Sequence, residues 1–344
     1  MSAENFLLSA ENLPDYLRSR GLAARDERLD VRALGGGVSN LVLLVEWPGN
    51  PGRRWVVKQS LGKLRVKDDW RSDRERIFRE ADSLRALRPF LGDGALPEVV
   101  HIDAENFLFI MTAAPAGSVV WKDSLLEGSV DLQVAGQAGR LLARMINASR
   151  SNPGFREDFE DQTVFDQLRI DPYYRTTAAR HPEARRDLED LIADSGGIRT
   201  ALVHGDYSPK NMLVKDGNIF LIDFEVIHWG DPAFDSAFLL NHLFLKALYQ
   251  PRFAARYFEA ARDFVRAARQ ELEHEDWPKF EAMTCRHLGG LMLARIDGKS
   301  PVEYIRDEAT KQRARAVSLR ILRERPNCVE EIVGMVLAVN DVAD

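Results

Sequence analysis

The character of the sequence changes near residues 112–117, and this change limits the folds open to the chain. Before it, short apolar runs alternate with turn residues, which is typical of strands. After it, long stretches carry helical spacing of apolar residues. We therefore expect an α+β protein of two domains or lobes. A small lobe with an antiparallel sheet spans residues 1–114, and a larger, mostly helical lobe spans residues 115–344.

The first part has two expected helices and four expected strands. Residues 12–20 and 73–89 carry helical patterns. The turn Pro48-Gly-Asn-Pro-Gly52 separates the first two strands. The expected strands are residues 40–47, 54–58, 99–102 and 107–111.

The second part is expected to be helical over residues 131–148 and over nearly all of 233–325. One strand pair interrupts it. The apolar runs 212–214 and 219–222 flank Lys215-Asp-Gly-Asn218, a sequence typical of a hairpin turn. We found no internal repeat and no low-complexity tract.

Composition excludes several classes of protein. Of the 344 residues, 45% are hydrophobic and 29% are charged, as is usual for globular chains. The formal net charge of −6 gives no basic field for nucleic acid. Two cysteines, Cys285 and Cys328, supply no disulfide framework. No signal peptide and no apolar run of about 20 residues is present. We expect a cytoplasmic protein without a membrane or nucleic-acid partner, and the sequence does not indicate its oligomeric state.

The strongest local signal is His204-Gly-Asp-Tyr-Ser-Pro-Lys-Asn211, followed by Leu221-Ile-Asp-Phe-Glu225. The hairpin brings Asp206, Asn211 and Asp223 toward each other. Two acids and an amide form a set of hard oxygen ligands that suits Mg²⁺ shared with phosphates. Phosphoryl transfer needs positioning and charge neutralisation more than covalent help. The alternative is a chance HGD sequence on a polar loop with structural carboxylates.

The pattern HGDxxxxN…DFE resembles the aminoglycoside phosphotransferase and choline kinase superfamily of small-molecule kinases. The resemblance implies a bilobal protein-kinase-like fold and the cofactors ATP and Mg²⁺. It also implies that Asp206 orients or deprotonates an acceptor hydroxyl, while Asn211 and Asp223 hold the metal ions. Glu225 completes an Asp-x-Glu pair that looks like the metal motif of methylthioribose kinases, to which Trp121–Gly128 is also similar.

Neighbouring residues have expected structural roles. We expect His204 to be a packed scaffold residue. Gly205 stands where many protein kinases carry an arginine, and the interval from Asp223 to Asp235 leaves little room for an activation loop. Both features argue against a protein kinase. We expect Asp235 to begin a helix and to bond the backbone of the catalytic loop, and Asp231 to be a turn or cap residue.

A glycine-rich loop precedes the first strand of the hairpin in the first part. Glycines allow the backbone to approach phosphate oxygens closely, although such triplets also mark flexible turns. The sequence Gly-Gly-x-Ser-Asn resembles the nucleotide loop of the superfamily. The candidate residues are Gly35, Gly36, Gly37, Ser39 and Asn40.

Lys58 lies in an apolar strand, where the superfamily places the lysine that contacts the α- and β-phosphates. Such a lysine needs an acidic partner on the following helix. At about 100° per residue, Glu80 falls within the apolar stripe of that helix and Glu75 falls nearly opposite. A buried carboxylate needs a partner. We therefore expect Glu80 to pair with Lys58, and Glu75 to lie at the surface.

The segment after the last expected strand would form the hinge that bonds the adenine edge through its backbone. The candidates are Met111, Thr112 and Ala114, with Val56 and Met111 as apolar walls that sandwich the ring. The same residues also suit strand core and linker.

The acceptor-binding residues are the least constrained. Segments 165–175 and 284–290 carry groups suited to a polar small molecule, but surface or helix packing explains them equally well. From Lys246 to Arg325, 17 basic residues face 12 acidic ones, which favours a neutral or anionic hydroxyl compound. The open candidates are Arg169, Asp171, Tyr173, Tyr174, Trp229, Arg286 and Arg295.

The sequence thus predicts a phosphotransferase that moves the γ-phosphate of Mg-ATP to a hydroxyl of a metabolite, sugar or antibiotic. The alternative is a catalytically silent nucleotide-binding scaffold of the same fold. That alternative predicts a broken residue among Lys58, Glu80, Asp206, Asn211 and Asp223, and none is broken.

Overall fold

The structure is a computed structural model, and it describes residues 6–35, 40–61, 74–274 and 276–340. The chain folds into two compact units, Met1–Gly117 and Ser118–Asp344. The boundary predicted from the sequence, between residues 114 and 115, lies three residues before this division.

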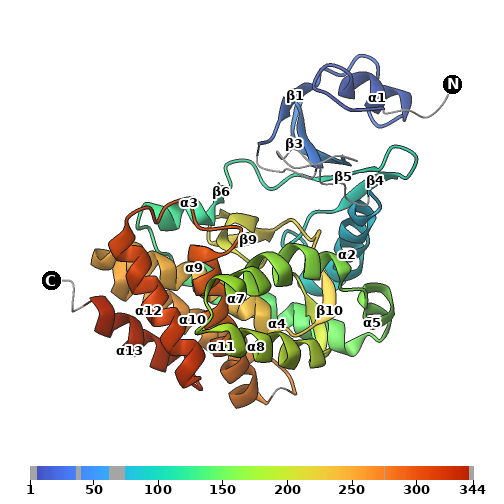
Figure 1. Cartoon of the computed structure of the whole chain (residues 1–344). Coiled ribbons are helices and arrows are strands. Elements are labelled where there is room, and N and C mark those ends of the chain that lie inside the picture. The colour runs from blue at the N-terminus through green and yellow to red at the C-terminus, as the bar shows by residue number, and fades with distance from the viewer. Residues whose placement is uncertain (1–5, 36–39, 62–73, 275, 341–344) are drawn as a thin grey trace. The chain divides into compact units, whose positions relative to one another are not determined.

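The N-terminal unit is built on a five-stranded antiparallel sheet with the strand order β1-β2-β3-β5-β4 (Figure 1). In the long β2–β3 ladder, Asn40 pairs with Ser60 and Val45 with Trp55. β3 already begins at Asn50, so the expected turn over residues 48–52 is shorter than predicted. The strands are β1 (Asp30–Ala33), β2 (Asn40–Trp47), β3 (Asn50–Ser60), β4 (Val99–Asp103) and β5 (Leu108–Thr112).

Two helices accompany this sheet. The short α1 (Leu13–Ser19) has a proline in its first turn, where the missing N–H has no helical partner anyway, and it shares an apolar cluster with β2 and β5. Helix α2 (Arg76–Leu91) buries the stripe that contains Ile77, Ala81 and Leu84, and it contacts β3, β4 and β5. The burial of this stripe fixes which face of α2 points to the sheet.

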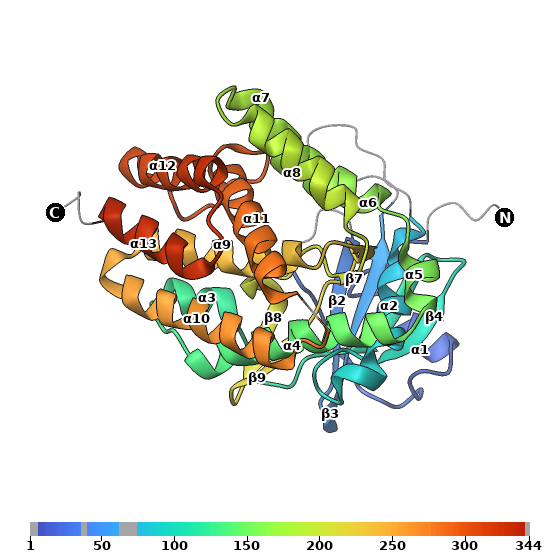
Figure 2. The ribbon, with the colours of Figure 1, turned by 90° about the horizontal axis from the view of Figure 1, so that it is seen from below.

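The C-terminal unit is mostly helical (Figures 1 and 2). Helix α9 (Ala233–Tyr249) is its centre, because every residue from Ala233 to Leu248 is buried. Helices α4 (Leu132–Ser151) and α10 (Ala254–Glu271) lie side by side. Helix α11 (Trp277–Asp297) packs on both α9 and α12 (Glu308–Glu324). The remaining helical segments are α3 (Trp121–Leu126), α5 (Gly154–Phe159), α6 (Thr163–Phe165), the π-helical η1 (Asp166–Arg175), α7 (Thr176–Arg180), α8 (Arg185–Gly197), the short η2 (Pro209–Asn211) and η3 (Pro251–Phe253), and α13 (Val329–Asn340).

Two small sheets hold the segments that carry the HGD motif. The predicted hairpin is present as β8 (Met212–Lys215) and β9 (Asn218–Leu221), with β6 (Val119–Val120) added to β8. A second ladder pairs β7 (Ala201–Val203) with β10 (His228–Gly230). The sequence did not indicate β6, β7 or β10, because strands of two or three residues are too short to show an alternating pattern.

The predicted fold class is confirmed: an antiparallel sheet is followed by a mostly helical region. Over the described residues, no helix combines the length and apolar composition that a membrane-spanning helix needs.

Candidate active site

The predicted catalytic loop, residues 204–211, begins where β7 ends and is fixed by helix α9. The two carboxylate oxygens of Asp235 accept the backbone N–H groups of His204 at 2.6 Å and Gly205 at 2.9 Å. Asp235 is fully buried, and burial raises its pKa to about 7, although both N–H bonds act in the opposite direction. The predicted contact between Asp235 and the loop backbone is confirmed.

Gly205 is required by the backbone of this loop. Its φ of +75° lies in the left-handed region. A Cβ at this position would lie 2.8 Å from Cγ1 of Val226 and 3.0 Å from its carbonyl oxygen. The absence of an arginine at this position therefore has a structural reason, because any residue with a Cβ would be strained here.

His204 is a scaffold residue, as predicted. Its Nδ1 lies 3.2 Å from the backbone N of Asp206, and its Nε2 lies 3.2 Å from the carbonyl oxygen of Ile222. The amide can only donate and the carbonyl can only accept, so Nε2 carries the proton. Burial lowers the pKa of His204 to about 4, which keeps the ring neutral. The ring thus ties the loop to the segment after β9.

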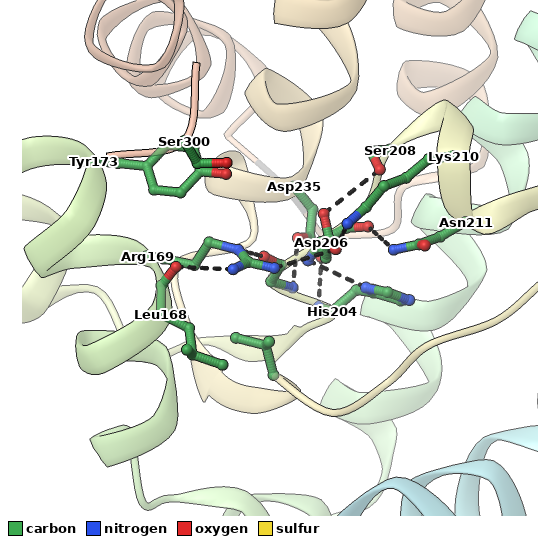
Figure 3. A network of polar contacts seen from close by, with 12 residues as sticks. Leu168, Arg169, Tyr173, His204, Asp206, Ser208, Lys210, Asn211, Asp235 and Ser300 are labelled. Carbon is green, nitrogen blue, oxygen red and sulfur yellow. Dashed lines mark hydrogen bonds and ion pairs between the residues drawn. The ribbon is translucent and has the colours of Figure 1, made fainter. Parts of the chain in front are cut away.

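Asp206 is buried between two cations (Figure 3). Lys210 Nζ lies 2.8 Å and Arg169 Nη2 lies 3.2 Å from Oδ2 of Asp206. Burial alone raises the pKa of Asp206, but the charges of Lys210 and Arg169 outweigh it and hold the pKa below its usual value. Asp206 is therefore ionised at neutral pH and acts as a hydrogen-bond acceptor.

Arg169 comes from η1, and the sequence did not identify its contact with Asp206. Its Nε donates to the carbonyl of Gly205 at 2.5 Å, and its Nη1 donates to that of Leu168 at 2.8 Å. The guanidinium thereby fixes both the backbone and the carboxylate of the loop. Lys210, four residues after Asp206 in the motif, was the cation that the sequence could have suggested.

The β8–β9 hairpin brings the three expected metal-binding residues to one end. The carbonyl of Asn211 accepts the N–H of Ile222 at 3.0 Å, which joins the start of β8 to the end of β9. Asp223 follows at once with a φ of +73°, uncommon for a residue with a side chain. The charges of Asp223 and Glu225 both act on Arg169.

This donor set fits a magnesium ion. The Nδ2 of Asn211 donates to the carbonyl of Asp206 at 3.0 Å, so the amide oxygen Oδ1 remains as an acceptor. Asp223 and Glu225 are both partly exposed. Among the described residues, no three His, Cys, Asp or Glu side chains gather at one point. The set is thus two carboxylates and an amide, which suits Mg²⁺ because that ion keeps several waters and phosphate oxygens as ligands.

In the N-terminal unit, the predicted pair of Lys58 and Glu80 is confirmed. Lys58 Nζ lies 2.7 Å from Oε1 and 2.9 Å from Oε2 of Glu80. Both side chains are buried, with 8% and 1% exposed. Glu75 is exposed at the start of α2, as expected. The contact of Lys58 with nucleotide phosphates stays a prediction.

The other nucleotide-binding candidates also stay predictions. Gly36, Gly37 and Ser39 lie outside the described residues, whereas Gly35 is exposed and Asn40 begins β2.

The expected hinge lies at the end of β5. Met111 lies opposite Val56 in the β3–β5 ladder, so the two side chains share one face of the sheet and can form one wall of an adenine site, not the two sides of a sandwich. The Thr112 hydroxyl accepts the N–H of Glu98 at 2.8 Å. The carbonyl of Ala114 accepts a bond from Arg54 at 2.6 Å, so one of its lone pairs is already used.

The seven open acceptor candidates fall into two groups. The first contains Arg169, which contacts Asp206, and the pair of Tyr173 and Arg295, in which Arg295 Nη1 donates to the Tyr173 hydroxyl at 3.2 Å. The other four lie in ion pairs or in the core: Asp171 pairs with Lys299, Arg286 pairs with Asp194, Trp229 donates to the carbonyl of Arg199, and Tyr174 bonds His287.

Asp231 caps α9 and also anchors a buried network that the sequence did not reveal. Its Oδ1 accepts the N–H of Ala233 at 3.0 Å, which confirms the cap. Its Oδ2 lies 3.0 Å from Nε2 of His287, whose Nδ1 lies 2.7 Å from the Tyr174 hydroxyl. A carboxylate only accepts, so Nε2 carries the proton and Tyr174 donates to Nδ1. The network connects η1, α9 and α11.

Residues 30–272 match the family model of the phosphotransferase enzyme family, and this range contains Lys58, Glu80, Arg169 and the segment from His204 to Asp235. The chain belongs to the phosphotransferase enzyme family. The resemblance inferred from the HGD motif is thereby confirmed.

Curated relatives support the same assignment at low identity. Methylthioribose kinase from Escherichia coli is 26% identical over 279 residues, covering 71% of this chain and 65% of its own length, just under two thirds. The 4-hydroxytryptamine kinase from Psilocybe cyanescens is 24% identical over 273 residues, covering 71% of this chain and 75% of its own length.

Solved structures show the same fold. An ethanolamine kinase from Plasmodium vivax matches with a TM-score of 0.59 at 14% identity, covering 94% of each chain. Amicoumacin kinase, in complex with AMP-PNP, Ca²⁺ and Ami, matches with a TM-score of 0.56 at 18% identity, covering 92% of this chain and 95% of its own.

Proposed function

We propose that this kinase transfers the γ-phosphoryl group of Mg-ATP to a hydroxyl group of a small molecule. The observation that carries the proposal is the state of Asp206, a buried carboxylate kept ionised by Lys210 and Arg169 on a loop held by Asp235. An acceptor-only group at a fixed position is what orientation of a hydroxyl requires.

Asp206 would act mainly by orientation. Its ionised carboxylate accepts the hydrogen bond of the acceptor hydroxyl and directs the oxygen lone pair along the line of attack. The neighbouring cations lower the pKa of Asp206 and make it a weak base. A weak base suffices because phosphoryl transfer has a loose transition state, in which the hydroxyl proton leaves late.

The proposed nucleotide-binding groups are a lysine cation in the N-terminal unit and a set of metal ligands in the C-terminal unit. Lys58, oriented by both oxygens of Glu80, supplies a fixed positive charge for the α- and β-phosphates. Asn211, Asp223 and Glu225 would hold Mg²⁺, which neutralises phosphate charge when bound. The family of this chain supports ATP as the phosphate donor.

The names of the relatives support a hydroxylated small molecule as acceptor, namely methylthioribose in one and 4-hydroxytryptamine in another. These two compounds share hydroxyl groups but differ in charge. The proposal therefore extends to the reaction and to the class of small hydroxyl compounds.

The test is an ATP-consumption screen of the purified chain against sugars, hydroxy acids, amino alcohols and antibiotics. We expect turnover with at least one class, and a loss of about 10²–10⁴-fold in kcat for Asp206→Ala with Mg-ATP binding largely retained. Mg-ATP binding without turnover on any compound would indicate the silent scaffold instead. The absence of both binding and turnover would refute the kinase proposal.

A further inference from the structure

A row of side chains leads along α9 from the catalytic loop to a cluster of basic residues. Phe238, His242 and Lys246 are spaced four apart, so they lie on one face of the helix. The ring of Phe238 lies 5.8 Å from that of His242, and Tyr304 packs against Lys246 with 5.0 Å from Nζ to the ring centroid. Together with Arg295 of α11, the residues His242, Lys246 and Tyr304 are called the basic cluster below.

Lys246 is a buried cation without an acidic partner. Its side chain is 0% exposed, and its Nζ makes one long contact of 3.4 Å, to the carbonyl of His242. Within the part of the chain that the structure describes, no carboxylate lies within 4.0 Å of the charged groups of Lys246 or Arg295. A charge buried in this way is costly unless something else neutralises it.

The cluster has more hydrogen-bond donors than acceptors. Arg295 Nη1 donates to the Tyr173 hydroxyl, to the Ser300 hydroxyl at 2.8 Å and to the Ser300 carbonyl. Its Nε, the Tyr304 hydroxyl and Nδ1 of His242 are buried and have no hydrogen-bond partner among the described residues. Each unsatisfied N–H or O–H donor among them costs free energy that an incoming acceptor would recover.

The local electrostatics are positive. Burial, Lys122 and Arg295 lower the pKa of Lys246 to about 7, and the carboxylates of Glu303 and Asp123 offset this only in part. Glu303 is already paired with Lys122. A further negative charge is therefore what would stabilise the cluster most.

The cluster reaches the surface at one edge and is connected to the catalytic loop. Ser300 is exposed and Arg295 and Tyr304 are half-buried, whereas Lys246 and the Nε atom of Arg295 are buried. The guanidinium carbons of Arg169 and Arg295 lie 5.8 Å and 5.9 Å from the ring centroid of Tyr173. Arg169 also contacts Asp206, so Tyr173 links the basic cluster to the carboxylate of the loop. Figure 3 shows Tyr173 and Ser300 together on the Arg169 side of the site.

From these observations we infer that the basic cluster binds an anionic group of the acceptor, a carboxylate or a phosphate. The inference rests on the proposed kinase function and narrows its substrate class to hydroxy acids and sugar phosphates. The Nε of Arg295, which lacks an acceptor among the described residues, is a donor for such a group, and Lys246 provides further positive charge. A protonated amine would meet cations here, because the charge of Asp206 is already matched by Lys210 and Arg169.

The test measures binding to the full chain without nucleotide, by calorimetry and thermal shift at constant ionic strength. The anionic probes are D-glycerate, D-gluconate and D-glucose 6-phosphate, and their neutral counterparts are glycerol, glucitol and glucose. We expect at least one anion to bind at least tenfold more tightly than its counterpart. The class that binds, carboxylate or phosphate, identifies the anionic group.

Two variants separate recognition from folding. Lys246→Met should weaken binding of the anion by about tenfold or more, yet keep or raise the melting temperature, because it removes a buried charge. The control Lys279→Met changes an exposed lysine paired with Asp276 and should leave binding unchanged. Equal binding of anions and neutral compounds, or unchanged anion binding in Lys246→Met, would overturn the inference.

Failure of the anion site and failure of the kinase proposal can be distinguished, because binding and turnover are measured separately. If anions bind through Lys246 but no ATP is consumed with any acceptor, the anion site stands and the kinase proposal fails. If a neutral or cationic acceptor is phosphorylated while no anion binds, the kinase proposal stands and the anion site is refuted.

Discussion

Replacing Asp235 with asparagine tests how the fold positions the catalytic loop. Asp235 is fully buried and accepts two backbone N–H groups, at 2.6 Å from His204 and 2.9 Å from Gly205. Asparagine has nearly the same shape but only one acceptor oxygen. Its amide NH₂ would face the other backbone N–H, and neither of these two donors can become an acceptor.

The expected cost follows from this geometry. One buried N–H is left unsatisfied, and the surviving bond no longer has a charged acceptor, so we expect a loss of roughly 2–4 kcal/mol in unfolding free energy. For a folded unit of this size, that corresponds to a melting temperature lower by roughly 5–15 °C. The displaced loop carries Asp206, and a shift of about 1 Å at such a group can cost about 10²-fold in kcat.

The assay is calorimetry of the full chain together with kcat on an acceptor found in the screen. The matched control is Asp231→Asn, in the turn that precedes α9. Its partner is His287, whose ring can shift its proton to Nδ1 and accept from the new amide, while Tyr174 changes from donor to acceptor. The hydroxyl proton of Tyr174 then lacks an acceptor, so the control should lose about 1–3 kcal/mol in unfolding free energy but keep its kcat, because the loop bonds to Asp235 are intact. An equal loss of kcat in both variants, or full kcat in Asp235→Asn, would refute the reasoning.

Three further predictions follow from the same contacts. Burial raises the pKa of Asp235 to about 7, so kcat should fall as the pH drops below 7 and the carboxylate gains a proton. The pH–rate profile of Asp235→Asn should lack this acidic decrease. An identical decrease in the variant would assign the titration to another group. Glu80→Ala removes the carboxylate partner of a buried lysine and should cost about 3–5 kcal/mol in unfolding free energy, with weaker Mg-ATP binding; an unchanged denaturation midpoint would contradict this. Gly205→Ala should cost more unfolding free energy than the about 1–2 kcal/mol of a left-handed alanine, because its Cβ would meet Val226. The control Gly21→Ala, with a φ of +69° and open space around Cβ, should cost only that amount. Equal denaturation midpoints in the two variants would contradict the steric argument.

Local patterns predicted much of the fold and part of the site. The apolar stripe of α2 was sufficient to select Glu80 over Glu75 as the partner of Lys58, because helical periodicity fixes which side chains face the sheet. The turn sequence and its flanking apolar runs predicted the β8–β9 hairpin. These features depend on residues close in the sequence, and such residues constrain each other directly.

Most contacts between distant segments could not be predicted from local patterns, and the contact of Asp235 with the loop was expected only through the family resemblance. Arg169 and Asp206 are far apart in the sequence, and the surrounding segment gave no sign of which face of η1 would meet the loop. The network of Tyr174, His287 and Asp231 joins three separate elements for the same reason. Strands β7 and β10 are three residues long, and only their pairing identifies them.

The central claim is that the ionised carboxylate of Asp206 orients the acceptor hydroxyl. The most direct measurement compares kcat and Mg-ATP affinity of Asp206→Asn with those of Asp216→Asn, an exposed position in the β8–β9 turn where asparagine tolerates the φ of +50°. We predict a loss of about 10²–10⁴-fold in kcat for Asp206→Asn, with nearly unchanged nucleotide affinity and no effect in the control. Near wild-type turnover in Asp206→Asn would contradict the account.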